Sequence, residues 1–286
     1  MMSSLLSVVK RHPLITFFVL TYALSWLAWP LWASGLYPIA PVFSFAPFLA
    51  ALVVLAITLG KSGVGGLLRR MVRWRVGIRW YAAALLIPAG ITVAAAMLNV
   101  LLGAQAPTSA ELGSWTSLLP GFAIALLIPG LGGAWEEPGW RGYALPRLQT
   151  GRSALFASLI LGVLIVGWHL PLMVVGQVHY SDIVLIIAAV IVFNWVFNNA
   201  NGSVLIIMLM HASNNTISGS FFSPMFSGAD SVRQSWMLAV VWCMVAIVVV
   251  IVAGPKHLSH KHKKQEEGEA AQPGVATPRT VKPTPA

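Results

Sequence analysis

The stretch Gly133-Ala-Trp-Glu-Glu-Pro-Gly-Trp-Arg-Gly-Tyr143 places two adjacent carboxylates, Glu136 and Glu137, at the end of a long apolar run. Arg141 follows the second carboxylate by four residues. Over residues 81–179 the only other charged residues are Glu111, Arg147 and Arg152. Ionisable side chains are costly in the hydrocarbon of a membrane, so they persist there only where they are used or neutralised. The stretch therefore predicts a functional or neutralised polar cluster within an apolar protein.

The composition excludes a soluble globular domain. The chain has 286 residues, of which 57% are hydrophobic and 9% are charged, whereas soluble domains carry about 25% charged residues. Repeated apolar runs of roughly 18–22 residues are typical of a multi-pass helical membrane protein. The net charge of +10 does not indicate nucleic-acid binding, because the basic residues lie at the ends of apolar segments. There they face anionic lipids, so membrane lipids are the expected partners.

These runs predict an all-α fold, a polytopic membrane bundle of about eight transmembrane helices. Residues 1–253 form the expected transmembrane domain. Residues 254–286 are expected to form a disordered cytoplasmic tail, because this segment is basic, then acidic, then proline-rich, without an apolar period. The expected helices span Pro13–Ala33, Val42–Leu59, Tyr81–Leu102, a run from Leu118 into the Glu-Glu motif, Ala154–Val175, Ile183–Phe197, Ser203–Ile217 and Trp236–Ala253.

The loop Lys61–Arg79 sets the expected orientation. It holds one lysine, five arginines and no acidic residue, which is typical of a cytoplasmic loop. Apolar residues alternate with the arginines, so part of the loop is expected to lie as an interfacial helix. With eight helices, both termini are then cytoplasmic. In a prokaryotic cell the protein would lie in the plasma membrane.

The spacing of Glu137 and Arg141 predicts an ion pair within one helical turn. That pair would leave Glu136 on a different face without a partner. Pro138 disfavours helical geometry at the preceding residue, so the helix is expected to be kinked or newly begun here. The alternative is an interfacial acid–arginine cluster that merely ends a helix.

Two histidines, His169 and His211, are the only ones inside apolar segments. His211 and Asn215 are four residues apart and therefore share one helical face. Taken singly, each has a structural explanation, since histidine and asparagine often bond neighbouring membrane helices. Taken together, three separate spans carry a carboxylate, a histidine and a histidine–amide pair. This combination indicates a catalytic site with a base, a second proton-handling group and two donors for an oxyanion.

These residues resemble the three motifs of the CPBP family of intramembrane proteases. The motifs are Glu136-Glu137-x-x-x-Arg141, then His169, then His211-x-x-x-Asn215. The family includes the type II CAAX prenyl proteases and the bacterial bacteriocin-processing and Abi proteins. The resemblance covers about residues 118–215, and it departs from the family at one position, where Ile165 stands in place of the usual phenylalanine.

The resemblance implies a peptidase acting on a membrane-associated protein or peptide. Glu136 and His169 would activate a water that attacks the peptide carbonyl. His211 and Asn215 would stabilise the resulting oxyanion.

By the same resemblance, Glu137 and Arg141 would support the site. No cofactor is expected. The family is often described as metalloproteases, however, and Glu136, His169 and His211 could supply a three-ligand zinc site. The His-Glu-x-x-His spacing of soluble zinc proteases is absent, which favours a metal-free site, and zinc remains the alternative.

A second class of function stays open, a non-enzymatic membrane protein such as a proton-coupled transporter or an immunity-type protein. Transporters more often show internal repeats, and none is visible here. One geometric question also remains. If the fourth helix ended near Trp135, Glu136 would lie at the cytoplasmic edge and His169 well across the bilayer. They meet only if the fourth helix runs on, or if the fifth starts later or tilts.

Overall fold

The expectation of an all-α fold is confirmed by a computed structural model that describes residues 2–37, 40–109, 111, 114–222 and 225–259. All regular structure in these residues is helical. Five segments are long and apolar enough to cross a membrane: α2–α3 (Pro13–Ala33), α4 (Ala46–Met71), α5 (Ile78–Leu101), α11 (Asp182–Asn199) and α13 (Gly228–Ala253). Two apolar helices are shorter, α6 (Trp115–Leu127) and α9 (Ala154–Trp168). The chain is thus a multi-pass membrane protein, and the count of eight spans remains a prediction.

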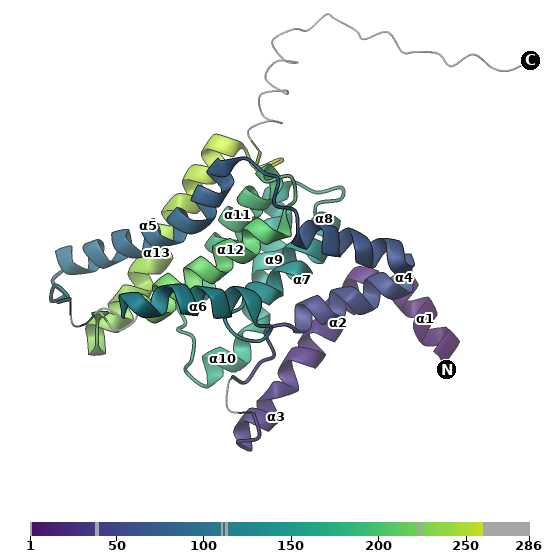
Figure 1. The fold of residues 1–286 in the computed structure, drawn as a ribbon, viewed down its shortest axis with the longest axis horizontal. Helices are drawn as coiled ribbons and strands as arrows, with labels where there is room; N and C mark the ends of the chain where they lie inside the picture. The colour runs from purple at the N-terminus through teal and green to yellow at the C-terminus, as the bar shows by residue number, and fades with distance from the viewer. Residues whose placement is uncertain (1, 38–39, 110, 112–113, 223–224, 260–286) are drawn as a thin grey trace, which may run out of the picture.

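The helices α9, α11 and α12 (Val204–Asn214) form the middle of the bundle (Figure 1). In this core α11 packs on α9 and α13, while α12 and α13 both pack on α5. The amino-terminal helices α1 (Met2–Arg11), α2 (Pro13–Trp26) and α4 lie together at the other side of the bundle, where α2 packs on α4. Large aromatic side chains that are fully or almost fully buried fill the centre, among them Trp140, Trp168 and Trp242.

The fourth helix ends earlier than its apolar run predicts. Ile128 is extended, with φ −103° and ψ 112°, because a residue before proline avoids helical geometry. Pro129 follows, and then Gly130, Gly132 and Gly133 adopt φ values of 89°, 94° and 79°. The expectation that the fourth helix runs into the Glu-Glu motif is therefore wrong. A sharp glycine-rich turn separates the helix from the motif.

The motif lies instead on a broken helix of its own. Its parts are η1 (Ala134–Glu136), α7 (Glu137–Gly139), the π-helical η2 (Trp140–Ala144) and α8 (Leu145–Leu148). Pro138 lies in the first turn of α7, a position that proline favours because its missing N–H would be unpaired there anyway. The helix is thus newly begun at the motif. At Gly139 an added Cβ would lie 2.5 Å from backbone atoms of Pro47, so the broken helix is pressed directly against α4.

Two other expected spans are also interrupted. The expected span Ala154–Val175 consists of α9 and α10 (Leu170–Val174), and His169 joins them as the cap of both. The helix α12 continues into a π-helical segment, η3 (Asn215–Phe221). Such segments are frequent at functional sites. In α4 the backbone breaks at Gly60, with φ 60° and ψ −150°, so the basic segment after it forms a separate helical part. The interfacial position of this part remains a prediction.

The start of the expected tail differs from the prediction, because residues 254–259 pack on the bundle. The carbonyl oxygens of Pro255 and Lys256 accept hydrogen bonds of 3.0 and 2.8 Å from the first N–H groups of α9. Leu258 is completely buried, and its carbonyl oxygen accepts a bond of 2.9 Å from Asn199. The expected boundary at residue 254 is therefore too early. The remainder of the expected tail, 260–286, lies outside the described residues.

We expect a chain that ends at Ser259 to keep the thermal stability of the full chain, and a chain that ends at Pro255 to lose stability. The shorter chain loses an acceptor at the start of α9 and the buried Leu258 side chain. Leu258→Ala in the full chain isolates the packing contribution, and burial of this kind is worth about 2–5 kcal/mol. Thermal unfolding of the purified proteins measures the loss of stability in each variant. Equal unfolding temperatures for both truncations would show that residues 256–259 are dispensable.

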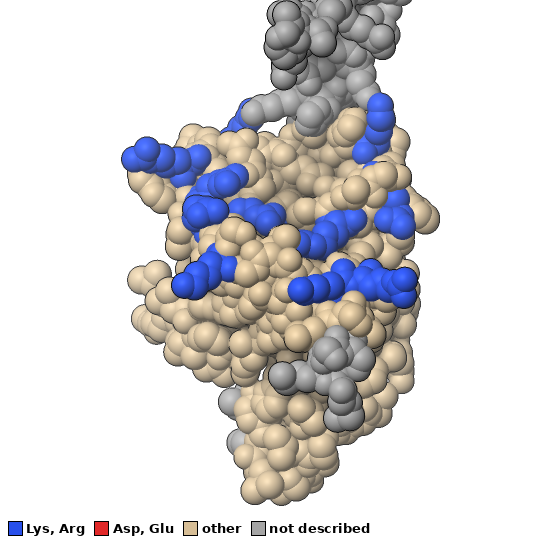
Figure 2. Space-filling view, turned by 90° about the vertical axis from the view of Figure 1, so that its right-hand side faces the viewer, with Lys and Arg blue, Asp and Glu red and all other residues tan. Residues whose placement is uncertain are grey.

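Lys and Arg side chains gather on one face of the molecule, and Figure 2 shows no Asp or Glu side chain on that face. Of the Lys and Arg side chains in the described residues, Arg141 and Arg233 pair with a carboxylate inside the described part of the chain. A basic surface of this kind suits contact with anionic lipid headgroups.

Candidate active site

All six site residues expected from the sequence line one cavity of about 670 Å³. They come from five places in the chain, namely η1, the start of α7, η2, the junction of α9 with α10, and the region where α12 passes into η3. The residues are Glu136, Glu137, Arg141, His169, His211 and Asn215. The broken helix that carries the motif brings Glu136 to the same cavity as His169, so the two residues meet although α6 ends before the motif.

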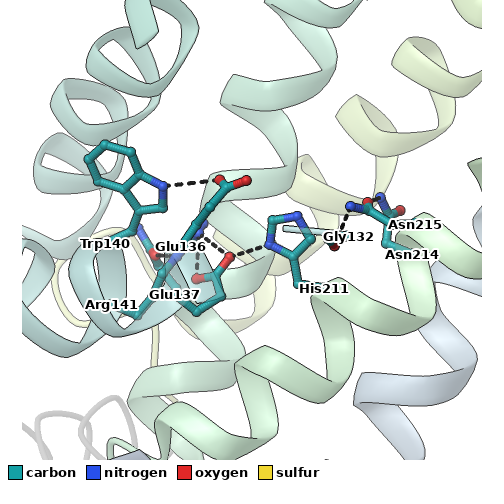
Figure 3. Close-up of polar contacts among 9 residues, drawn as sticks. Gly132, Glu136, Glu137, Trp140, Arg141, His211, Asn214 and Asn215 are labelled. Carbon is teal, nitrogen blue, oxygen red and sulfur yellow. Dashed lines mark hydrogen bonds and ion pairs between the residues drawn. The ribbon is translucent and has the colours of Figure 1, made fainter. Parts of the chain in front are cut away.

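Glu137 is the centre of a buried charged cluster (Figure 3). Arg141 Nη1 donates to both carboxylate oxygens of Glu137, at 2.9 and 2.8 Å. The ion pair expected from the four-residue spacing is therefore present. His211 Nδ1 lies 2.6 Å from Glu137 Oε1. Since the Glu137 side chain has no exposed surface and that of Arg141 only 4%, the two charges neutralise each other out of contact with water.

Asn194 of α11 completes this cluster, and the sequence reasoning did not identify it. Its Oδ1 accepts a bond of 3.0 Å from Arg141 Nε, and its Nδ2 donates to Ser158 Oγ at 2.9 Å. The ring of Phe193 lies 5.0 Å from the Arg141 guanidinium carbon. A fully buried asparagine in the middle of an apolar helix was the available signal, because such a residue needs polar partners.

Glu136 has a partner, contrary to the expectation that it would have none. Trp140 Nε1 donates to Glu136 Oε2 at 3.2 Å, and Glu136 is 5% exposed. The indole thus holds one carboxylate oxygen and leaves Oε1 to face the cavity.

Gly133 marks the point where the polar atoms of the site converge. A Cβ at this position would lie 2.5 Å from His211 Nε2, 3.0 Å from Asn215 Nδ2 and 3.1 Å from Glu136 Oε1. These three atoms therefore surround one small volume beside the Gly133 backbone. Both the positive φ of 79° and the lack of space call for glycine here.

The amide of Asn215 has a defined orientation. Its Nδ2 donates to the carbonyl oxygen of Gly132 at 2.7 Å, and its Oδ1 accepts a bond of 3.1 Å from Asn214 Nδ2. Asn214 thus orients the neighbouring amide. One N–H of Asn215 remains available to the space beside Gly133 (Figure 3).

His169 reaches the cavity from the break between α9 and α10. Its Nδ1 lies 2.8 Å from the carbonyl oxygen of Ile165, so Nδ1 carries the proton and Nε2 is the nitrogen left for the cavity. The preceding Trp168 is fixed by α2, because its Nε1 donates to Ser25 Oγ at 2.6 Å and its carbonyl oxygen accepts a bond of 3.2 Å from Trp26. The helix α2 thus positions the turn that carries His169.

Metal binding by Glu136, His169 and His211 stays a prediction that the structure does not test. Within the described part of the chain, no group of three His, Cys, Asp or Glu side chains is placed to hold a metal ion. The Nδ1 hydrogen bonds of both histidines leave each Nε2 as the nitrogen that faces the cavity.

Comparisons with known proteins find similarity over the part of the chain that carries these residues. Residues 114–217 match the family model described as "Type II CAAX prenyl endopeptidase Rce1-like", and this range contains the six site residues. The chain is also similar to CAAX prenyl protease 2 of Methanococcus maripaludis, with 24% identity over 188 residues, covering 63% of this chain and 69% of that protein. With the three motifs gathered around one cavity, these matches show that the chain is similar to CAAX-protease-like membrane proteins over the part that carries the site.

Proposed function

We propose that this protein is an intramembrane endopeptidase that hydrolyses a peptide bond with a water activated by Glu136. The observation that carries the proposal is the convergence of Glu136 Oε1, His211 Nε2 and Asn215 Nδ2 beside Gly133 within a cavity large enough for a peptide. A base and two donors aimed at one small volume are what acyl transfer to water requires.

Glu136 is the group that takes the proton of the water. Its Oε1 faces the common volume, while Trp140 holds Oε2. The water oxygen attacks the carbonyl carbon as its proton passes to Glu136. When the C–N bond breaks, Glu136 returns that proton to the leaving amine. Atoms and charge then balance without a metal or another cofactor.

His211 and Asn215 are the donors to the oxyanion. Glu137 accepts from His211 Nδ1, so His211 Nε2 can donate only when the ring carries both protons. The Glu137 carboxylate is placed to pair with the ring in that form, at 2.6 Å. The N–H of Asn215 that does not bond Gly132 is the second donor. Glu137 and Arg141 therefore act as positioning residues that hold His211.

His169 completes the proposed machinery. Its Nε2 is free of the bond that fixes Nδ1, so it can accept a hydrogen bond from the attacking water or relay its proton. The Ile165 carbonyl fixes the tautomer that makes this role available.

The proposed substrate is a membrane-associated protein or peptide. The Lys/Arg distribution further supports an orientation with both termini in the cytoplasm, and membrane lipids would contact the basic face (Figure 2).

The mechanism is tested by one purified preparation assayed for peptide hydrolysis with and without a strong chelator and analysed for bound metal. We expect activity to survive the chelator. Asn215→Ala should retain measurable activity with little change in KM, because removing one oxyanion donor typically costs about 10²–10³ in kcat. His169→Ala should be inactive at every pH.

Several results would contradict this mechanism. Stoichiometric zinc, with activity lost to the chelator and restored by the metal, would favour the metal alternative while retaining a peptidase. Full activity of Asn215→Ala would remove this residue from the oxyanion site. Failure of the folded wild-type protein to cleave any peptide of a broad reporter set would favour the non-enzymatic class.

A further inference from the structure

The active-site cavity extends along one side of α11, away from the catalytic cluster. The helix contributes Asp182, Leu185, Ile186, Ala189, Val190 and Phe193 to its wall. These positions follow the spacing i, i+3, i+4, i+7, i+8 and i+11, which is one continuous face of an α-helix. The wall is therefore a straight stripe that is apolar along its length and carries a single carboxylate at its first residue.

The two ends of this stripe differ in chemistry. Phe193 lies at the catalytic end, since its ring centroid is 6.0 Å from that of His211 and 5.0 Å from the Arg141 guanidinium carbon. Asp182 lies eleven residues earlier, which is about 16 Å along the helix at ~1.5 Å per residue. The cavity has a volume of about 670 Å³, which lies within the usual range of ligand-binding pockets. About five residues of extended chain, at ~3.3 Å each, cover the distance.

The carboxylate of Asp182 has no ion pair with Lys, Arg or His in the described residues. Ser181 Oγ makes a long contact of 3.4 Å to it, and the neighbouring His179 also stabilises it, through its backbone and its ring charge. By contrast, Glu137 at the catalytic end is paired with Arg141. A cation in the far end of the cavity would therefore meet a carboxylate that no lysine or arginine of the described residues pairs with.

We propose that Asp182 is a specificity-determining residue that binds a cationic side chain, lysine or arginine, about five residues from the cleaved bond of an otherwise apolar peptide segment. This inference rests on the proposed peptidase function, because it assigns the substrate chain to the same cavity. The apolar stripe binds the intervening residues, and Asp182 fixes the register in which the scissile bond meets Glu136.

The competing explanation is that Asp182 only stabilises the start of α11, as acids in the first turn of a helix do. Asp230 provides a matched control. It is the first-turn acid of α13, it does not line the cavity, and it pairs with Arg233 at 2.8 Å. A role at the helix start predicts similar consequences for Asp182→Asn and Asp230→Asn.

The test uses the full-length protein in lipid nanodiscs and carries Glu136→Gln, so that binding is measured without turnover. Three labelled peptides share an apolar segment and place lysine, norleucine or glutamate at one position. We expect the lysine peptide to bind about two- to fivefold more tightly than the norleucine peptide, the size of a partly solvated ion pair. Asp182→Asn should abolish this preference, Asp182→Lys should reverse it in favour of glutamate, and Asp230→Asn should leave it unchanged.

The second measurement is the cut site in the enzyme with Glu136 intact, mapped by mass spectrometry while the lysine is moved along the peptide. The cut should follow the lysine at a constant spacing of about five residues. Equal binding of the three peptides, or an unchanged preference in Asp182→Asn, would overturn the assignment of Asp182. Charge-dependent binding without any cleavage would leave Asp182 as a binding residue and contradict only the proposed peptidase function.

Discussion

Glu136→Gln is expected to abolish peptide hydrolysis while leaving the fold and the unfolding temperature nearly unchanged. Glutamine has almost the same shape as glutamate, and its amide oxygen can still accept the 3.2 Å bond from Trp140 Nε1. It cannot take a proton from water, however, and loss of a general base typically costs about 10²–10⁴ in rate. Hydrolysis of a reporter peptide, measured beside thermal unfolding of the same preparation, checks both halves of this expectation.

Glu136→Asp is the informative companion to this variant. Aspartate keeps a carboxylate base, but its shorter side chain withdraws that base from the volume beside Gly133. In the wild-type protein, Glu136 Oε1 lies 3.1 Å from where a Cβ at Gly133 would be. We expect it to retain partial activity. If Glu136→Gln is active while Glu137→Gln folds normally and is inactive, the two carboxylates have the opposite roles.

Glu137→Gln and Arg141→Ala are expected to damage folding before they affect chemistry. Glu137 receives two bonds from Arg141 and one from His211, and the pair is closed to solvent. Removing one member leaves the other charge buried and unpaired, which typically costs about 3–5 kcal/mol. In a protein of this size that free energy corresponds to a fall of roughly 6–20 °C in unfolding temperature.

The double variant Glu137→Gln/Arg141→Met separates loss of the pair from the presence of an unpaired charge. Both charges are then gone, so much of the lost stability should return. Activity should not return, because His211 no longer has the carboxylate that orients its ring. If the double variant is as unstable as the sum of the two single variants, an uncompensated charge is not the cause of the instability.

The helical segments and the members of the site were predictable from the sequence because both depend on local signals. Hydropathy over about twenty residues identifies a membrane helix. A spacing of four residues places Glu137 beside Arg141 in any helix, whatever surrounds it. The rarity of ionisable residues in the apolar runs was enough to single out His169 and His211.

The partners that come from other helices were not predictable in the same way. Whether Asn194 faces Arg141 or lipid depends on the rotation of α11, which hydropathy does not reveal. The role of Gly133 depends on a contact between distant segments. His211 of α12 lies 78 positions later in the chain, and nothing local in the sequence shows that it packs against the Gly133 turn. Leu258 is a single buried apolar side chain in a polar segment, so no hydrophobic periodicity in the sequence predicts its burial. The early end of α6 did have a local signal, because Ile128-Pro129 and the glycines that follow favour a helix end and a turn. Hydropathy alone outweighed this signal, since the apolar run continues past it.

The i, i+4 geometry of Glu137 and Arg141 has a consequence for how the protein is made. Both residues leave the ribosome within one helical turn of each other, so their ion pair can close before α11 and α12 have been synthesised. A segment entering the membrane then presents one net negative charge, that of Glu136, in place of three separate charges. Asn194 and His211 are synthesised later, so they can join a pair that is already formed. The chain order thus allows the site to be assembled around the Glu137–Arg141 pair.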